Sequence, residues 1–175
     1  SSTDGARVTG GIDFGDTYTP TNPSFTGGIT GNFEGSSAVM PNFGDLELSR
    51  VMRTQAFGAN LGVFLAVPDG TYKIQLLFWE PHFGLRGVPS DGAGSRVFNI
   101  AVEGQPAVTG LDLIARHGLG ILNKGVIYTF VVTVTDGTLD VSLTGTTANA
   151  TLAGIVVSST SSTATGPADV IGTED

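Results

Sequence analysis

The segment from Tyr72 to Glu80 places apolar side chains at every second position. Tyr72, Ile74, Leu76 and Phe78 therefore share one face of an extended strand, because successive side chains of a strand point to opposite sides. Strands with one long apolar face must bury that face against another layer. This alternation therefore predicts a half-buried β-sheet, and it limits the fold more than any other feature of the chain.

Two charged residues lie on these apolar faces. Glu80 continues the face of Phe78, and Arg96 lies two residues before Phe98 on the core face of the next predicted strand. A buried charge is rarely tolerated without a partner. We therefore predict an inward-facing Glu80–Arg96 ion pair with a structural role.

Strand signals recur along the chain, whereas helical periodicity is nearly absent. Turns rich in Gly, Pro and Asp separate the strands. The predicted strands are residues 51–54, 62–67, 72–80, 95–102, 127–135, 139–143 and 150–157. Residues 111–117 are the only helix candidate and fit an extended crossover equally well. These signals predict an all-β fold, a jelly-roll-like antiparallel β-sandwich with long loops on one rim.

Residues 126–140 are expected to form a β-hairpin around the Asp136-Gly137 turn. Tyr128, Phe130, Val132 and Val134 would face the core. The intervening side chains, which are mostly Thr, would face water.

The two ends of the chain differ from its centre. Residues 11–43 are dense in Gly, Thr, Pro and Asn, which predicts long loops around a short first strand near residues 7–12. The Ser/Thr-rich end has the composition of a linker to a neighbouring domain. We therefore predict one sandwich domain over residues 1–158 and a linker or disordered tail over residues 159–175.

Composition excludes several classes of function. The formal net charge is −8, with only eight Lys and Arg residues, so binding to nucleic acid or to an anionic membrane surface is not expected. The chain has no Cys, which excludes disulfides and thiolate chemistry. No apolar run has the length of a transmembrane helix. The low charge and high Gly, Ser and Thr content are typical of secreted, extracellular or cell-surface bacterial β-modules.

Catalytic signals are weak. Neither of the two His residues lies near a nucleophile motif, so a serine-type triad is not expected. A glycosidase would need a pair of carboxylates across a cleft, and no spacing specifies one. The acidic candidates, each more simply read as solvated surface, are Glu34, Glu47, Asp91 and Asp112. The sequence therefore predicts a protein that is not an enzyme and needs no cofactor.

A structural calcium ion is a second, weaker hypothesis. Asp13 and Asp16 offer hard oxygen ligands within one loop. Short Asp-containing loops also form Asx-turns without any metal. Two distant His residues make zinc improbable.

Several segments together resemble the malectin and malectin-like domains, a carbohydrate-binding family. They are GTYKIQLLFWEPHF (70–83), GSRVFNIAVEGQ (94–105), LDL (111–113), YTFVVTVTDGTLDVSLTG (128–145) and ATLAGIVV (150–157). The resemblance extends from about residue 6 to residue 157, and the order and spacing of these segments are more specific than any one of them.

The resemblance implies a jelly-roll-like sandwich that binds carbohydrate and catalyses nothing. It places sugar-binding aromatic residues at His82 and Phe83, a third in residues 52–57, and a polar contact near Asn149. The chain has His82 where the family has a phenol, Trp79 where it has a small residue and Asn149 where it has a carboxylate. Glucose-type specificity therefore does not transfer directly.

Sugar recognition needs flat apolar faces and planar polar groups, since a sugar ring has a C–H face and a girdle of hydroxyls. The candidate faces are Phe57, His82 and Phe83. Trp79 is a further candidate ligand contact, and its position on the face opposite Phe78 also fits packing between strand and loop. The candidate polar contacts are Arg53, Arg86, Asp91 and Asn149. Each has a simpler alternative as a core, loop-anchoring or surface residue.

The sequence thus favours a non-catalytic carbohydrate-binding module of a secreted multidomain protein. Its ligand would be an oligo- or polysaccharide, and its partner would be a neighbouring domain of the same chain. The alternative is a structural or protein-interaction β-sandwich of a surface protein or adhesin, without a sugar site. Two or more aromatic rings in a concave loop surface would favour the module, and rings turned inward would favour the alternative.

Overall fold

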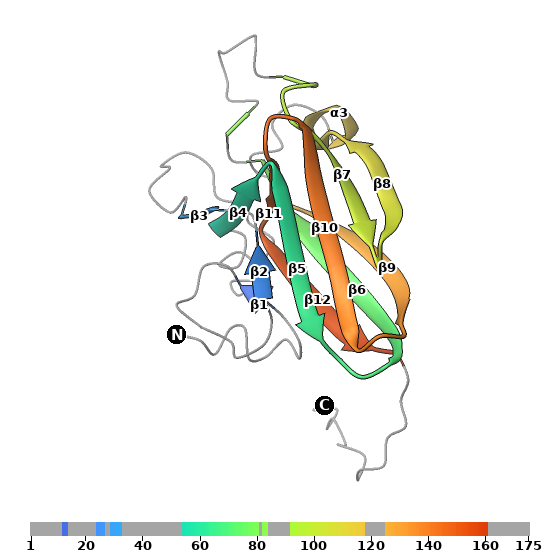
Figure 1. The fold of residues 1–175 in the computed structure, drawn as a ribbon. Coiled ribbons are helices and arrows are strands. Elements are labelled where there is room, and N and C mark those ends of the chain that lie inside the picture. Colours follow the sequence, from blue (N-terminus) through green and yellow to red (C-terminus); the bar gives the residue numbers. More distant parts are fainter. Residues whose placement is uncertain are drawn as a thin grey trace, which may run out of the picture.

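The computed structural model describes residues 12–13, 24–26, 29–32, 54–80, 82–83, 92–117 and 125–160. Every strand pair in these residues is antiparallel. The predicted all-β antiparallel sandwich is therefore confirmed. Figure 1 shows the two large sheets, one in front of the other. No helix in the described residues has the length and apolar character needed to cross a membrane.

The first large sheet has the strand order β1-β12-β6-β9. Its strands are β1 (Ile12–Asp13), β12 (Gly154–Ser159), β6 (Gly70–Phe78) and β9 (Val126–Val134). The second has the order β2-β5-β10-β7-β8. Its strands are β2 (Ser24–Thr26), β5 (Asn60–Ala66), β10 (Thr138–Thr147), β7 (Val97–Val102) and β8 (Gln105–Leu111).

A smaller third sheet lies beside the two large ones (Figure 1). Its order is β11-β4-β3, with strands β11 (Ala150–Leu152), β4 (Thr54–Gly58) and β3 (Ile29–Asn32). Strand β4 overlaps the strand predicted at residues 51–54 at Thr54 and continues to Gly58, whereas residues 51–53 lie outside the described residues. The region expected to consist of long loops contains β2 and β3.

The core lies between the large sheets. Ile74, Leu76 and Phe78 of β6 are fully buried, as the alternation predicted. The Phe78 ring lies 5.7 Å from the ring of Phe98 in the opposite sheet, measured between centroids. Contacts of this kind bury the apolar faces of both sheets, which provides the main stabilisation of a sandwich.

The predicted hairpin at residues 126–140 is wrong, although the predicted faces are right. Val134 is buried and Thr129 and Thr133 are exposed. However, β9 pairs with β6, whereas β10 pairs with β5 and β7 in the other sheet. Alternation shows which side of a strand is buried, but it does not identify the neighbouring strand. The Asp136-Gly137 turn therefore connects the two layers.

Two further expectations are corrected. The last predicted strand is divided at Ala153 into β11 and β12, which belong to different sheets. Strand β8 was not predicted, because Pro106 and Gly110 are uncommon within strands. It lies at the edge of its sheet, where a proline is tolerated.

The helix candidate forms a short helix, α3 (Leu113–His117). Asp112 precedes it, and the Oδ1 atom of Asp112 accepts a hydrogen bond from the backbone N–H of Ala115 at 2.8 Å. Its other oxygen accepts from the N–H of Gly94 at 2.5 Å. Asp112 is thus an N-cap residue, which satisfies a backbone donor at the helix start.

Candidate functional site

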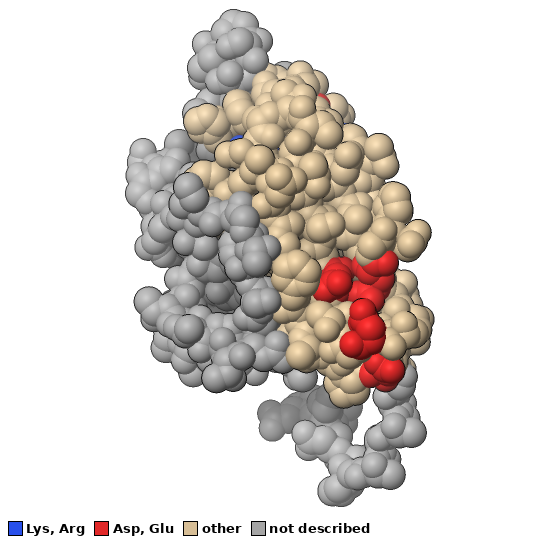
Figure 2. Space-filling view, in the orientation of Figure 1, with Lys and Arg blue, Asp and Glu red and all other residues tan. Residues whose placement is uncertain are grey.

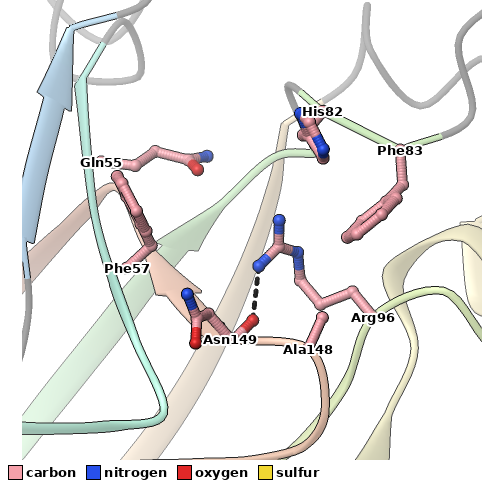
Figure 3. A pocket seen from close by; sticks show the side chains of 7 residues that line it. All are labelled: Gln55, Phe57, His82, Phe83, Arg96, Ala148 and Asn149. Atoms are coloured by element: carbon pink, nitrogen blue, oxygen red, sulfur yellow. Dashed lines mark hydrogen bonds between the residues drawn. The ribbon is translucent and has the colours of Figure 1, made fainter.

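An open pocket of about 340 Å³ lies at one end of the sandwich. It is formed where β6 ends, where β7 begins and where β10 turns into β11, with β4 on one side (Figure 3). Its volume is at the lower end of the range of small-molecule sites. The lining residues are Gln55, Phe57, His82, Phe83, Arg96, Ala148 and Asn149.

Glu80 holds the aromatic segment in place. Its carboxylate is fully buried. The Oε1 atom accepts hydrogen bonds from the backbone N–H groups of His82 and Phe83, with N···O distances of 2.9 and 3.0 Å. Hydrogen bonds from backbone donors to a carboxylate are stronger than neutral ones. Glu80 therefore fixes the chain direction immediately after β6 and directs the two rings to the pocket.

Arg96 connects three segments that meet at the pocket. Its Nε atom donates to Oε2 of Glu80 at 2.6 Å, and Nη2 makes a longer contact of 3.4 Å with Oε1. Its Nη1 atom donates to the backbone carbonyl of Asn149. The guanidinium also lies over the Phe83 ring, 5.0 Å from its centroid, which is a cation–π contact. The predicted Glu80–Arg96 pair is confirmed, and Arg96 also lines the pocket.

The aromatic residues form opposite walls. Phe57 and Phe83 are half-buried, and His82 is exposed. The His82 and Phe83 rings meet edge to face, with centroids 4.8 Å apart and planes at 77°. Figure 3 shows the Phe57 and Phe83 rings on opposite sides of the Arg96 guanidinium. The pocket therefore offers more than one flat apolar surface around a polar centre.

Gln55 lies on β4 beside Phe57, and it is only 1% exposed. Its Nε2 atom donates to the backbone carbonyl of Trp79 at 2.7 Å, and its Oε1 atom accepts from the Thr151 hydroxyl at 2.6 Å. These bonds join β4 to β11 and to the end of β6. Sequence reasoning missed Gln55, although its position two residues before Phe57 puts both side chains on one face of β4.

The turn that carries Asn149 has special backbone geometry. Ala148 has a positive φ of 55°. Gly145 tolerates no side chain, because an added Cβ would collide with the carbonyl oxygen of Ala148. The N–H of Gly145 is also bonded to the carbonyl of Ala59 at 2.8 Å. A glycine at this position lets the turn fold back tightly, so that Asn149 reaches the pocket.

The structure brings together four of the predicted contacts, namely Phe57, His82, Phe83 and Asn149. Trp79 does not line the pocket, and at 2% exposure it is a buried residue. This placement corrects its inclusion among the ligand contacts, because alternation turns Trp79 away from the face that Phe78 and Glu80 share. Arg53, Arg86 and Asp91 lie outside the described residues.

The metal hypothesis stays a prediction. Asp16 and the side chain of Asp13 lie outside the described part of the chain. Within the described part, no group of three His, Asp or Glu side chains has the arrangement of a metal site.

An all-β sandwich with an open, aromatic-walled pocket among its loops belongs to the class of ligand-binding β-domains. The family model of the malectin domain matches residues 31–163, which is more than half of the chain. The chain therefore belongs to the malectin domain family, a family of carbohydrate-binding β-domains.

Solved structures show the same fold. A β-glucuronidase of Bacteroides uniformis superposes with a TM-score of 0.62 at 19% identity, covering 82% of this chain and 15% of the enzyme chain. The plant receptor-like kinase FER superposes with a TM-score of 0.54 at 18% identity, covering 74% of this chain and 39% of its own. The present chain thus spans only part of each of these proteins. No curated protein matches the sequence.

Proposed function

We propose that this domain binds an oligo- or polysaccharide in the pocket and catalyses no reaction on it. The observation that carries the proposal is the convergence of the Phe57, His82 and Phe83 rings around Arg96 and Asn149 in one open pocket. Membership of the malectin domain family supports the same ligand class.

The chemistry of the pocket suits a sugar. The C–H face of a sugar ring packs on a phenyl ring, and its hydroxyls hydrogen-bond to planar amide and guanidinium groups. The guanidinium is held by Glu80 and by the Asn149 carbonyl before any ligand arrives. A preorganised donor loses less conformational entropy on binding, which supports affinity in a small site.

The absence of catalysis is part of the proposal. Hydrolysis of a glycosidic bond requires two carboxyl groups that flank it. Among the described residues that line the pocket there is no Asp or Glu. Glu80 lies behind the lining, and its oxygens accept hydrogen bonds from Arg96, His82 and Phe83. A carboxylate held in this way is suited to support the pocket walls.

We further propose that the domain is an extracellular module of a larger protein. The β-glucuronidase chain contains the same fold within 15% of its length, which supports this arrangement. A module that binds a polysaccharide raises the local concentration of the attached domain, so even weak binding at a single site is useful.

A glycan array with the wild-type domain and two Phe→Ala variants tests the proposal. Phe83→Ala removes a pocket wall, whereas Phe64→Ala removes a 37% exposed ring on the outer face of β5. We expect wild type and Phe64→Ala to bind the same glycan, and Phe83→Ala to bind it about tenfold more weakly, which corresponds to about 1.4 kcal/mol. The proposal fails if the wild-type domain binds no glycan.

The alternative function is protein–protein interaction, and one surface favours it. Ile127 and Val131 on the outer face of β9 are 45% and 67% exposed. Strand β9 is an edge strand of its sheet within the described residues. Exposed edges of low charge can pair with a strand of another chain. Binding of a protein ligand that is lost in Val131→Lys, together with an empty glycan array, would favour this alternative.

A further inference from the structure

We propose that Arg96 is the specificity-determining residue of the pocket and that its pairing with Glu80 selects neutral sugars over uronic acids. The inference rests on the proposed function, because it assigns a ligand class to the same site. In this arrangement the free edge of the guanidinium donates two hydrogen bonds to neighbouring hydroxyl oxygens of one sugar.

The first step concerns the donors of Arg96. A guanidinium has five N–H groups in a rigid plane. One on Nε and one on Nη2 are directed to the Glu80 carboxylate, and one on Nη1 is directed to the carbonyl of Asn149. Among the described residues, two N–H groups therefore remain without a partner, one on each terminal nitrogen. They are held in position by the bonds that the other three make.

The second step concerns direction. Figure 3 shows the bond from Nη1 to Asn149 leaving on the side of the Arg96 aliphatic stem, while the outer edge of the guanidinium faces across the pocket toward Gln55 and Phe57. The Cζ atom of the same group lies over the Phe83 ring, 5.0 Å from its centroid. A ligand that lies between the aromatic walls therefore meets two parallel N–H donors at the outer edge of the guanidinium. Such a fork fits two adjacent oxygens on one sugar ring.

The third step concerns charge. Adjacent hydroxyls and a carboxylate both offer two oxygens, but a carboxylate adds a negative charge. Glu80 already balances Arg96 at 2.6 Å, and the pair is almost completely buried. A uronate would therefore add a negative charge beside Glu80, where the charge of the guanidinium is already balanced, so little electrostatic attraction would offset the loss of its hydration. Neutral hydroxyls make the same two bonds without that cost.

The test is an array in which neutral glucans, galactans and mannans are each printed beside the same oligosaccharide oxidised at C6 to the uronate. Affinities are then measured by calorimetry for the best-bound neutral oligosaccharide and its oxidised counterpart. We expect the neutral form to bind at least about tenfold more tightly. Equal or tighter binding of the uronate overturns the inference and leaves the proposed function intact. An array without any bound glycan overturns both.

Salt separates the pocket effect from repulsion by the whole chain. The formal net charge of −8 also disfavours anionic ligands, but that long-range effect is screened at high ionic strength. Selection by the Glu80–Arg96 pair acts at short range within the pocket and is screened much less. We expect the preference for the neutral sugar to persist in 1 M NaCl. Its disappearance at that ionic strength would contradict the assignment to Arg96.

A conservative variant tests the donor fork itself. Arg96→Lys keeps the positive charge next to Glu80 but loses the parallel N–H groups. We expect about tenfold weaker binding of the neutral sugar, with the fold checked by the amide spectrum. Arg116→Lys is the matched control, because Arg116 is exposed at the end of α3. Unchanged affinity in a folded Arg96→Lys protein would overturn the role of the fork.

Discussion

The two ends of the sandwich both gather polar side chains, but they use them differently. At the pocket end, aromatic rings surround Arg96 in an open space. At the opposite end, hydrogen bonds of the turns and the effect of Asp136 on Asp140 bring together Asp69, Glu103, Asp136 and Asp140. Figure 2 shows acidic side chains gathered in one red patch. Asp69 and Asp136 precede β6 and β10, whereas His82 and Asn149 follow the same two strands.

At the acidic end, most carboxylate bonds close turns. The Asp69 carboxylate accepts a hydrogen bond from the backbone N–H of Gly137 at 2.9 Å. The Glu103 carboxylate accepts one from the backbone N–H of Asp140 at 2.7 Å. Asp136 accepts the N–H of Thr138 at 3.1 Å. At the pocket end, Glu80 also accepts hydrogen bonds from backbone N–H groups. The Arg96 guanidinium, however, has N–H donors that face the open pocket. The acidic end also has unused capacity, since the buried Oδ1 atom of Asp140 has no hydrogen-bond partner among the described residues. The difference is that the unused groups at the pocket end are donors that border an open space, which a ligand can reach.

The largest expected difference comes from removing one carboxylate at each end. Glu80→Ala leaves Arg96 buried without its partner and two N–H groups without an acceptor, so we expect a loss of about 3–5 kcal/mol of unfolding free energy. Glu103→Ala removes one turn hydrogen bond and should cost about 1 kcal/mol. Urea denaturation of both variants measures the two losses of unfolding free energy. Equal losses in the two variants would contradict the comparison.

Replacing one glycine at each end by alanine should give a smaller difference in unfolding free energy. Gly145→Ala forces a methyl group against the carbonyl of Ala148, and we expect a loss of about 1–3 kcal/mol together with weaker glycan binding. Gly104→Ala meets no neighbour and has only the strain of its positive φ of 67°, about 1 kcal/mol. Thermal unfolding and glycan titration measure both effects. Full glycan affinity in Gly145→Ala would show that this turn does not position Asn149.

The smallest effect concerns Asp140 at the acidic end. Burial, with a contribution from the Asp136 carboxylate, raises the pKa of Asp140 above its ordinary value of 3.8. The folded state therefore disfavours the ionised form, so Asp140 lowers stability at neutral pH, and this penalty disappears as the pH falls through the folded pKa. We expect Asp140→Asn to raise the urea midpoint slightly at pH 7 and to have less effect near pH 3.5. A larger stabilisation by Asp140→Asn at about pH 3.5 than at pH 7 would contradict a raised pKa of Asp140.

Local patterns in the sequence were enough to predict which faces are buried. The alternation from Tyr72 to Phe78 placed those side chains in the core, and its continuation placed Glu80 inward with Arg96 as its partner. These predictions succeed because strand geometry determines the side of each residue and because a buried charge needs a counter-charge.

Strand pairing could not be read from the same patterns. Strands β9 and β10 bury alternate residues against one core from opposite sheets, and a hairpin would give the same alternation. No sequence pattern indicates the break between β11 and β12 at Ala153, because apolar residues continue through it. Both features depend on contacts between residues far apart in the chain.

The candidate site was predicted in part. His82, Phe83, Phe57 and Asn149 were found through the family pattern and meet at the pocket. Arg96 was assigned a purely structural role, because its inward position gave no sign that the guanidinium also borders open space. Gln55 was missed for a similar reason, since its bonds to Trp79 and Thr151 depend on the meeting of three separate strands.

The most direct test of the central claim is an NMR titration of the full chain with the best-bound oligosaccharide from the array. We predict that the perturbed signals include the His82 and Phe83 amides, the Asn149 side-chain amide and the Arg96 guanidinium. The amides of Asp69, Glu103 and Asp136 at the opposite end should remain unchanged. Perturbations centred on the acidic end, or saturation without any change at the pocket, would contradict the account.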